Sequence, residues 1–194
     1  MIFLLLFVPL IAMALYAIGV YNFLATAKVR IKASIQEIGN QLKRQAELIP
    51  NLEESVKGYL KHEKEIFALL TSARKSVASA IDSNNLGEMV KASDSLAKIL
   101  PSIQATFESN PEIKASELVK NLMSNLTDTA DKVSYSRRLL IDLTADYNAK
   151  LVTFPSSVVA NLFGFKAEAG LTTPETGSHV EVSSTDVITP KVKL

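Results

Sequence analysis

The sequence predicts an all-α protein, an antiparallel up-down four-helix bundle whose first helix is continuous with an N-terminal transmembrane helix. Three observations support this prediction. Ala, Leu, Lys, Glu and Ser dominate the 194 residues, which include only 7 Gly and no Trp, and this composition favours helices over sheets. No charged side chain precedes Lys28. After Lys28, apolar residues recur at steps of three and four, the period of an amphipathic helix.

The uncharged N-terminal run extends from residue 2 to residue 27 as IFLLLFVPLIAMALYAIGVYNFLATA. As a helix it is long enough to cross a hydrocarbon core of about 30 Å. A cleavable signal peptide is the alternative, but no basic residues precede the run, and it exceeds the roughly 7–15 apolar residues of a signal peptide. We therefore expect residues 1–24 to form an uncleaved anchor. Because basic flanks stay in the cytoplasm, Lys28, Arg30 and Lys32 predict an external N-terminus and a cytoplasmic bundle.

The predicted bundle occupies residues 25–154. Its first helix is expected to end near Ile49, because the residue before a proline is disfavoured in the α conformation. The second helix is expected to begin at Pro50 or Asn51 and to reach Ile81. The bundle would therefore have its first corner at the proline.

Two further corners complete the predicted bundle. Residues 82–87, DSNNLG, combine turn-forming and capping residues between the second and third helices. The third helix reaches Phe107 and contains Pro101, which is expected to kink it. Residues 108–116, ESNPEIKAS, then lead to a long fourth helix that ends at Pro155. Short connections favour antiparallel neighbours, so the four helices are expected to alternate in direction.

This alternation returns the chain to the membrane at residues 155–166, which form a short amphipathic segment. Ser156 or Ser157 is expected to cap a short helix there. The segment could lie in the membrane interface or fold back onto the end of the bundle, and the sequence leaves both possibilities open. Residues 167–194 lack periodicity and are predicted to be a disordered tail. The apolar side chains of the short helix are Val158, Val159, Leu162 and Phe163.

The surroundings of His62 test for metal or catalytic chemistry. A di-iron bundle needs Glu-x-x-His on two helices, but residue 59 is Tyr and the other histidine, His179, lies in the predicted tail. A zinc protease needs His-Glu-x-x-His, but residue 66 is Ile. The sequence has no Gly-x-Ser-x-Gly elbow, glycine-rich phosphate loop or cysteine. We therefore expect no catalytic residue, metal, cofactor or small-molecule substrate, and the net charge of +1 argues against a nucleic-acid partner.

Two basic pairs lie on the predicted helices. Of Arg137 and Arg138, one must point nearer the core, where it needs a carboxylate partner from another helix. Asp142 lies four residues after Arg138 and predicts a surface ion pair. The other pair, Lys43 and Arg44, predicts a basic surface patch.

Several short words occur in order over residues 16–166. They are YNFL at Tyr21, QLKRQAELIPNLEESVKGYLKHEKE from Gln41, NPEIKA from Asn110, YSRRLLIDLTADYN from Tyr135 and FPSSVVANLFGF from Phe154. Together these words resemble the LemA family. The resemblance implies an antiparallel helical bundle behind one membrane helix, no established enzymatic activity, and a bacterial source, which places the anchor in the inner (plasma) membrane. The sequence departs from the family pattern at Ser34, Gly39, Gln45, Ala130, Leu140 and Ile141.

We therefore expect a membrane-anchored, non-enzymatic scaffold or adaptor that binds an unknown protein partner. The alternatives are a membrane-shaping or lipid-associated structural protein, and a metal-dependent hydrolase that uses His62, Glu63 and Arg137. Candidate interaction residues come from the family words and the exposed clusters. They are Tyr21, Asn22, Lys43, Arg44, Pro50, Asn51, Lys57, Gly58, Tyr59, His62, Glu63, Arg137, Arg138, Tyr147, Asn148, Phe154, Pro155, Phe163 and Phe165.

Overall fold

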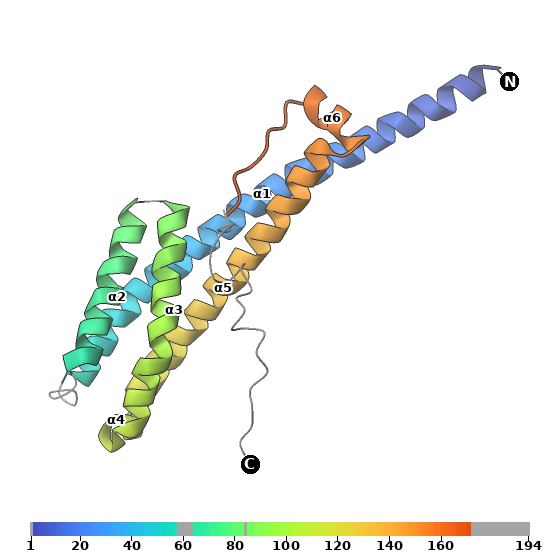
Figure 1. The fold of residues 1–194 in the computed structure, drawn as a ribbon. Coiled ribbons are helices and arrows are strands. Elements are labelled where there is room, and N and C mark those ends of the chain that lie inside the picture. Colours follow the sequence, from blue (N-terminus) through green and yellow to red (C-terminus); the bar gives the residue numbers. More distant parts are fainter. Residues whose placement is uncertain (1, 58–63, 84, 172–194) are drawn as a thin grey trace, which may run out of the picture.

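The computed structural model describes residues 2–57, 64–83 and 85–171, and every regular element in these ranges is a helix. This confirms the predicted all-α class. The elements, labelled in Figure 1, are α1 (Ile2–Val56), α2 (Lys64–Ser83), α3 (Leu86–Ser109), α4 (Pro111–Ala115), α5 (Glu117–Val152) and α6 (Ser156–Leu162).

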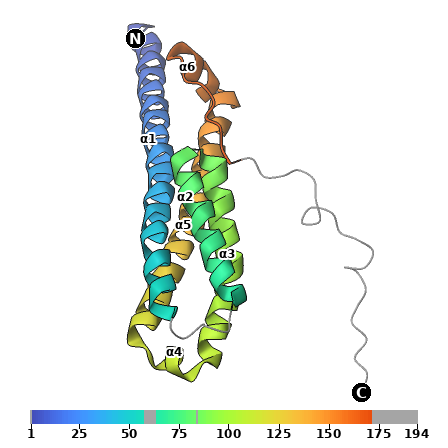
Figure 2. The ribbon, with the colours of Figure 1, turned by 90° about the vertical axis from the view of Figure 1, so that its left-hand side faces the viewer.

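The longest helices, α1 and α5, lie side by side and run in opposite directions (Figures 1 and 2). The α2–α3 hairpin packs against them over the half of α1 that is distant from the N-terminus. The short helix α4 closes this distal end, whereas α6 lies beside α1 at the other end of α5. The beginning of α1 projects beyond all other elements.

The core consists mainly of leucine, isoleucine, valine and alanine side chains, most of them contributed by the four long helices. Ile38 and Leu42 of α1, Leu70 of α2, Leu96 of α3 and Leu126 of α5 are all completely buried. Full burial of such a side chain is worth about 1.5–3 kcal/mol. Within each long helix of the core, buried residues recur at steps of three and four, and this spacing places them on one face of the helix.

The predicted end of the first helix at Pro50 is wrong, because α1 continues through this proline to Val56. A proline inside a helix removes one backbone hydrogen bond and costs about 3 kcal/mol or more. Leu52 and Val56, which follow Pro50 in the same helix, are completely buried, and this burial offsets the cost. The Asn51 side chain also donates a 3.1 Å hydrogen bond to the carbonyl of Glu47.

The first corner therefore lies after Val56, and the predicted start of the second helix at residue 50 or 51 is also wrong. Lys57 is in a turn and α2 begins at Lys64. The candidate residues Gly58, Tyr59, His62 and Glu63 fall between these points and lie outside the described residues.

Asparagine and serine caps define the two later corners, and the sequence predicted capping residues at the first of these, residues 82–87. Asn85 caps α3, and its Oδ1 accepts hydrogen bonds from the backbone N–H groups of Gly87 and Glu88 at 2.8 and 3.3 Å. Asn110 caps α4 in the same way, and Ser116 caps α5. Such caps satisfy N–H groups that have no partner within the helix. Pro101 lies inside α3, which is one helix from Leu86 to Ser109.

The turn between α5 and α6 differs in detail from the prediction. The N-cap residue of α6 is Pro155, and neither Ser156 nor Ser157 caps the helix. Ser156 is the first helical residue and is buried, and its hydroxyl donates a 2.9 Å hydrogen bond back to the carbonyl of Thr153. The serine thus stabilises the turn after α5 rather than the start of α6.

Candidate membrane-proximal site

The first part of α1 exposes apolar side chains all round the helix. From Phe7 to Gly19 every side chain is exposed except that of Ala17, which is partly buried. A helix that is apolar on all sides normally lies in a protein core or a membrane, and no other described part of the chain covers this one. Among the described residues, α1 alone is long and apolar enough to cross a membrane. Its large exposed side chains include Phe7, Val8, Leu10, Ile11, Met13, Leu15 and Ile18.

The helix α6 packs against α1 where this exposed part ends. The Tyr21 ring meets the Phe163 ring edge-on at a centroid distance of 5.0 Å, and meets the Phe165 ring edge-on at 5.5 Å. Aromatic pairs of this kind contribute about 0.5–1.5 kcal/mol beyond their burial. Val159 and Ala160 are buried on the inner face of α6. These contacts fix α6 at the level of Tyr21.

The outer face of α6 and the turn before it are also apolar. We call Phe154, Val158, Leu162 and Phe163 the apolar rim. Their exposed fractions are 84%, 60%, 78% and 53%. The sequence left open whether this segment faces the membrane interface or folds back onto the helices. The structure has one face of α6 packed on α1 and α5 and the other uncovered.

Residues 166–171, which we call the strap, follow α6 and run back along α1 and α5. Lys28 Nζ on α1 lies 2.9 Å from Glu168 Oε1 in an ion pair. On α5, the Tyr147 hydroxyl donates a 2.9 Å hydrogen bond to the carbonyl of Lys166. Asn148 donates to the Glu168 carbonyl at 3.0 Å and accepts from the Glu168 N–H at 3.1 Å. The strap therefore joins both long helices.

The contacts of the strap correct the prediction of a disordered tail from residue 167 onward. Leu171 packs against the hydrophobic core, and the polar contacts of Glu168 hold the segment before it. The prediction is wrong for residues 167–171, while residues 172–194 lie outside the described residues.

Two ionisable groups beneath α6 are shifted from their ordinary behaviour. The hydrogen bond and the charge of Glu168 raise the pKa of Lys28 above 10.5. Burial raises the pKa of the Tyr147 hydroxyl above 10.0, because the phenolate form would lose its hydration. Both shifts keep the proton on the group that holds the strap. Another basic group, Lys150 near the end of α5, lies 5.8 Å from the centre of the Phe23 ring, within range of a cation–π contact.

The arginine pair lies in the middle of α5, away from α6. Arg137 forms an ion pair with Asp94 of α3, as predicted for the arginine nearer the core. Its Nε is buried and has no hydrogen-bond partner in the described part of the chain. Arg138 is exposed, and the predicted ion pair with Asp142 does not occur within the described ranges. Arg137 therefore connects α5 to α3.

The remaining candidates fall at separate places along α1. Lys43 and Arg44 are exposed, and Arg44 donates a 3.4 Å hydrogen bond to Asn125 Oδ1. Pro50 and Asn51 lie near the distal end of α1, and Lys57 follows its last residue. Among the candidates that the structure describes, those at the α6 end are thus grouped, and Asn22 is exposed there between Tyr21 and Phe23. That group comprises Tyr21, Asn22, Tyr147, Asn148, Phe154, Pro155, Phe163 and Phe165.

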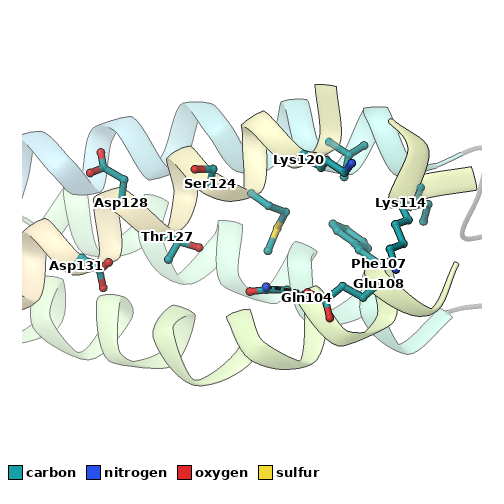
Figure 3. Close-up of a pocket in the computed structure, with 12 residues that line it drawn as sticks. Gln104, Phe107, Glu108, Lys114, Lys120, Ser124, Thr127, Asp128 and Asp131 are labelled. Atoms are coloured by element: carbon teal, nitrogen blue, oxygen red, sulfur yellow. Dashed lines mark hydrogen bonds between the residues drawn. The ribbon is translucent and has the colours of Figure 1, made fainter. Parts of the chain in front are cut away.

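Sequence reasoning missed a hollow of about 720 Å³ at the distal end, between α3, α4 and α5 (Figure 3). Phe107 and Met123 provide apolar lining, and Lys114, Glu108 and Asp128 are among the charged groups around it. Its residues come from three elements with no shared sequence word, so only the packed structure brings them together. No cluster of three or more His, Cys, Asp or Glu suited to a metal ion occurs among the residues described.

A family model described as LemA family matches residues 34–183 of the chain. The chain belongs to the LemA family. The LemA match begins at Ser34, so it covers the packed helices, α6 and the strap but not the apolar first part of α1. Comparison with curated proteins gives no match.

Proposed function

We propose that this LemA family protein is a single-pass, membrane-anchored scaffold or adaptor without enzymatic activity. Residues 1–24 cross the inner (plasma) membrane, with the N-terminus outside. The four long helices form a four-helix bundle in the cytoplasm, continuous with the anchor through α1. The observation that carries this proposal is the uncovered, all-round apolar surface of α1 before Val20.

The energetics of that surface favour a lipid environment. Full burial of a Leu, Ile, Val, Phe or Met side chain is worth about 1.5–3 kcal/mol, so the seven large side chains named above represent on the order of 10–20 kcal/mol. This is comparable to the whole stability of a folded domain, about 5–15 kcal/mol. A soluble protein would bury such a surface within its own fold or against a partner, whereas a bilayer buries it without further contacts.

The dimensions of α1 agree with this assignment. At about 1.5 Å per residue, the helix from Ile2 to Tyr21 is roughly 30 Å long, the thickness of a hydrocarbon core. Tyr21 is then at the boundary, where amphipathic aromatic rings are favoured. Lys28, Arg30 and Lys32 follow within the next turns, and their charge supports a cytoplasmic bundle.

The adaptor role is supported by the position and lining of the distal hollow. From Tyr21 to Val56, α1 extends roughly 50 Å, so the hollow between α3, α4 and α5 faces away from the membrane. An apolar lining surrounded by charges of both signs is the usual composition of a protein contact. We propose that this end of the bundle receives a segment of the protein partner.

Fractionation of cells that express the full chain tests the anchor. The protein should sediment with membranes, resist high salt and urea, and dissolve in detergent, whereas a variant lacking residues 1–24 should be soluble. A soluble full chain, or a mature protein that begins after Tyr21, would contradict the proposal.

The natural chain contains no cysteine, so a single added thiol tests orientation and partner binding. A membrane-impermeant maleimide should label Thr127→Cys only in lysed cells. A photo-crosslinker at Thr127, which lines the hollow, should capture a defined partner, whereas one at the exposed Tyr135 should not. Equal capture at both positions would argue against the hollow as the contact.

A further inference from the structure

We propose that α6 and the turn before it are a second lipid-contact element, which inserts the apolar rim into the membrane interface beside the anchor. Lys28, Lys150 and Lys166 then lie near the level of the anionic headgroups. This inference rests on the proposed anchoring of α1. It assigns to the rim (Phe154, Val158, Leu162 and Phe163) a lipid surface rather than a protein partner.

The position of α6 along α1 carries the first step. Tyr21 holds Phe163 and Phe165 in edge-on contacts, and the buried Val159 and Ala160 complete the packing. Because the span from Ile2 to Tyr21 is roughly as long as the hydrocarbon core is thick, the anchor brings α6 to the membrane boundary. Any outward face of α6 therefore lies at the height of the interface.

The composition of the outward face carries the second step. From Leu151 to Phe165 the chain contains no Asp, Glu, Lys or Arg, while Lys150 and Lys166 lie immediately on either side. Leu162, the most exposed of the large apolar residues of α6, is 78% accessible. A helix that faces water normally carries charged residues on its outer side. Apolar side chains between basic residues instead match a helix that lies in the plane of an anionic membrane surface.

The third step rests on how the α6 segment is attached to the long helices at both of its ends. After α6 the chain reverses at Gly164, whose φ of 71° suits glycine, and the Phe165 N–H donates a 3.0 Å hydrogen bond to the Ala160 carbonyl. The strap then ties the returning chain to α1 through Lys28 and Glu168. Both ends of the segment are therefore attached to the long helices, and the rim cannot turn away without breaking these contacts.

The depth of single labels in the full chain tests the proposal. Fluorophores at Leu162→Cys, Leu15→Cys and Thr127→Cys would be compared in phosphatidylcholine vesicles that contain lipids with a shallow doxyl quencher. We expect quenching at residue 162 to be severalfold stronger than at residue 127. Thr127 is the matched control because it is also exposed but lies at the distal end.

The label at residue 15 separates failure of this inference from failure of the anchor. Quenching at 15 but not at 162 would overturn the lipid contact of the rim and leave the anchor intact. Loss of quenching at both positions would overturn the anchor and the inference together. Excimer formation between pyrene labels at 162 that survives dilution with lipid would mean that a second copy covers the rim, and would also overturn the inference.

A charge on the rim tests whether its apolar surface causes the contact. Val158→Asp, with the label at 162, should reduce quenching to the level of residue 127 while the helical circular dichroism is unchanged. Tyr135→Asp, on an exposed site of α5, should leave quenching at 162 unaltered. Unchanged quenching in Val158→Asp would overturn the proposal.

Vesicles with added phosphatidylglycerol test the part assigned to the lysines. We expect stronger quenching at residue 162 in these vesicles than in phosphatidylcholine alone, and high salt should remove the difference. The same quenching in both lipids would overturn the role of Lys28, Lys150 and Lys166.

Discussion

Before Val20, the apolar side chains of α1 surround the helix and are exposed; after Val20, most of them occupy one face and are buried, with Val29 among the exceptions. Leu24, Ile31 and Leu42 illustrate the second pattern, since each packs into the core while charged residues such as Lys32 face water. The backbone is the same helix throughout. The difference teaches that the surroundings of a helix can change along its length without a break in secondary structure, and that the arrangement of its apolar residues marks the change.

The largest effect should come from a cavity in the buried part. Leu42→Ala should lower the free energy of unfolding of the helical body by about 2–5 kcal/mol, because Leu42 is completely buried. The matched change Leu10→Ala, at an exposed site before Val20, should lower it by less than about 0.5 kcal/mol. Denaturant titration of the full chain in detergent micelles measures both. A similar decrease in the free energy of unfolding for Leu42→Ala and Leu10→Ala would contradict the difference between the parts of α1 before and after Val20.

When membrane insertion is measured instead of folding, a charge placed before Val20 should have a larger effect than a charge placed after it. Leu10→Arg places a charge inside the proposed anchor, at a cost of about 2.5–3.5 kcal/mol for insertion. The membrane-bound fraction should fall, while the body keeps its helical signal. Val29→Arg, at an exposed site beyond the anchor, is the control and should not alter the fraction. An unchanged fraction in Leu10→Arg would contradict the anchor.

The part of α1 after Val20 also contains a buried polar side chain without a hydrogen-bond partner in the described residues. Gln45 is completely buried, and neither polar atom of its side chain has a hydrogen-bond partner in the described residues. Gln45→Met keeps the volume and removes this unpaired amide, so it should stabilise the body by about 1–3 kcal/mol. Gln36→Met, at an exposed position on the same helix, should have little effect. Destabilisation by Gln45→Met would mean that the amide has a partner.

The smallest effect concerns the strap, which lies close to the junction between the two parts. The pKa of Lys28 is raised in the fold by Glu168, so the folded chain holds this proton more tightly than the unfolded chain. The stabilisation is therefore complete below the ordinary value of 10.5 and is lost as the pH rises through the raised pKa. The raised pKa of Tyr147 has the same sign.

The motion of a spin label at Ala169→Cys measures this release. The label should become more mobile as the pH passes above 10.5, whereas a label at Ser134→Cys in the middle of α5 should not. Glu168→Gln should increase the mobility of the strap label already at neutral pH. A label that stays immobile above that pH would show that the Lys28 contact does not hold the strap.

Local patterns were sufficient to predict the helical class and a capping residue within residues 82–87, which the structure has at Asn85. They were insufficient at Pro50, because the rule for a residue before proline is local, whereas the burial of Leu52 and Val56 depends on neighbouring helices. The chemistry around Arg137 was predictable in kind, namely a carboxylate from another helix. That this carboxylate belongs to Asp94 follows only from the packing of α3 on α5.

The sequence predicted residues of the candidate site as members of separate family words, but it did not predict that these residues lie together. Tyr21 and Phe163 belong to family words at opposite ends of the chain, and the packing of α6 on α1 brings them together. Glu168 gave no signal, because its partners Lys28 and Asn148 are distant in sequence and its own surroundings have the composition of a loop.

A scan of single cysteines along α1, from Phe7 to Ala46, in membrane vesicles tests the central claim most directly. Each full-length variant would be treated with a water-soluble maleimide. Positions before about Tyr21 should be unreactive on every side of the helix, and later positions should react with a period of 3.6 residues that excludes Leu24, Ile31 and Leu42. Reactivity with the same helical period from the first positions onward would contradict a membrane-crossing first part of α1.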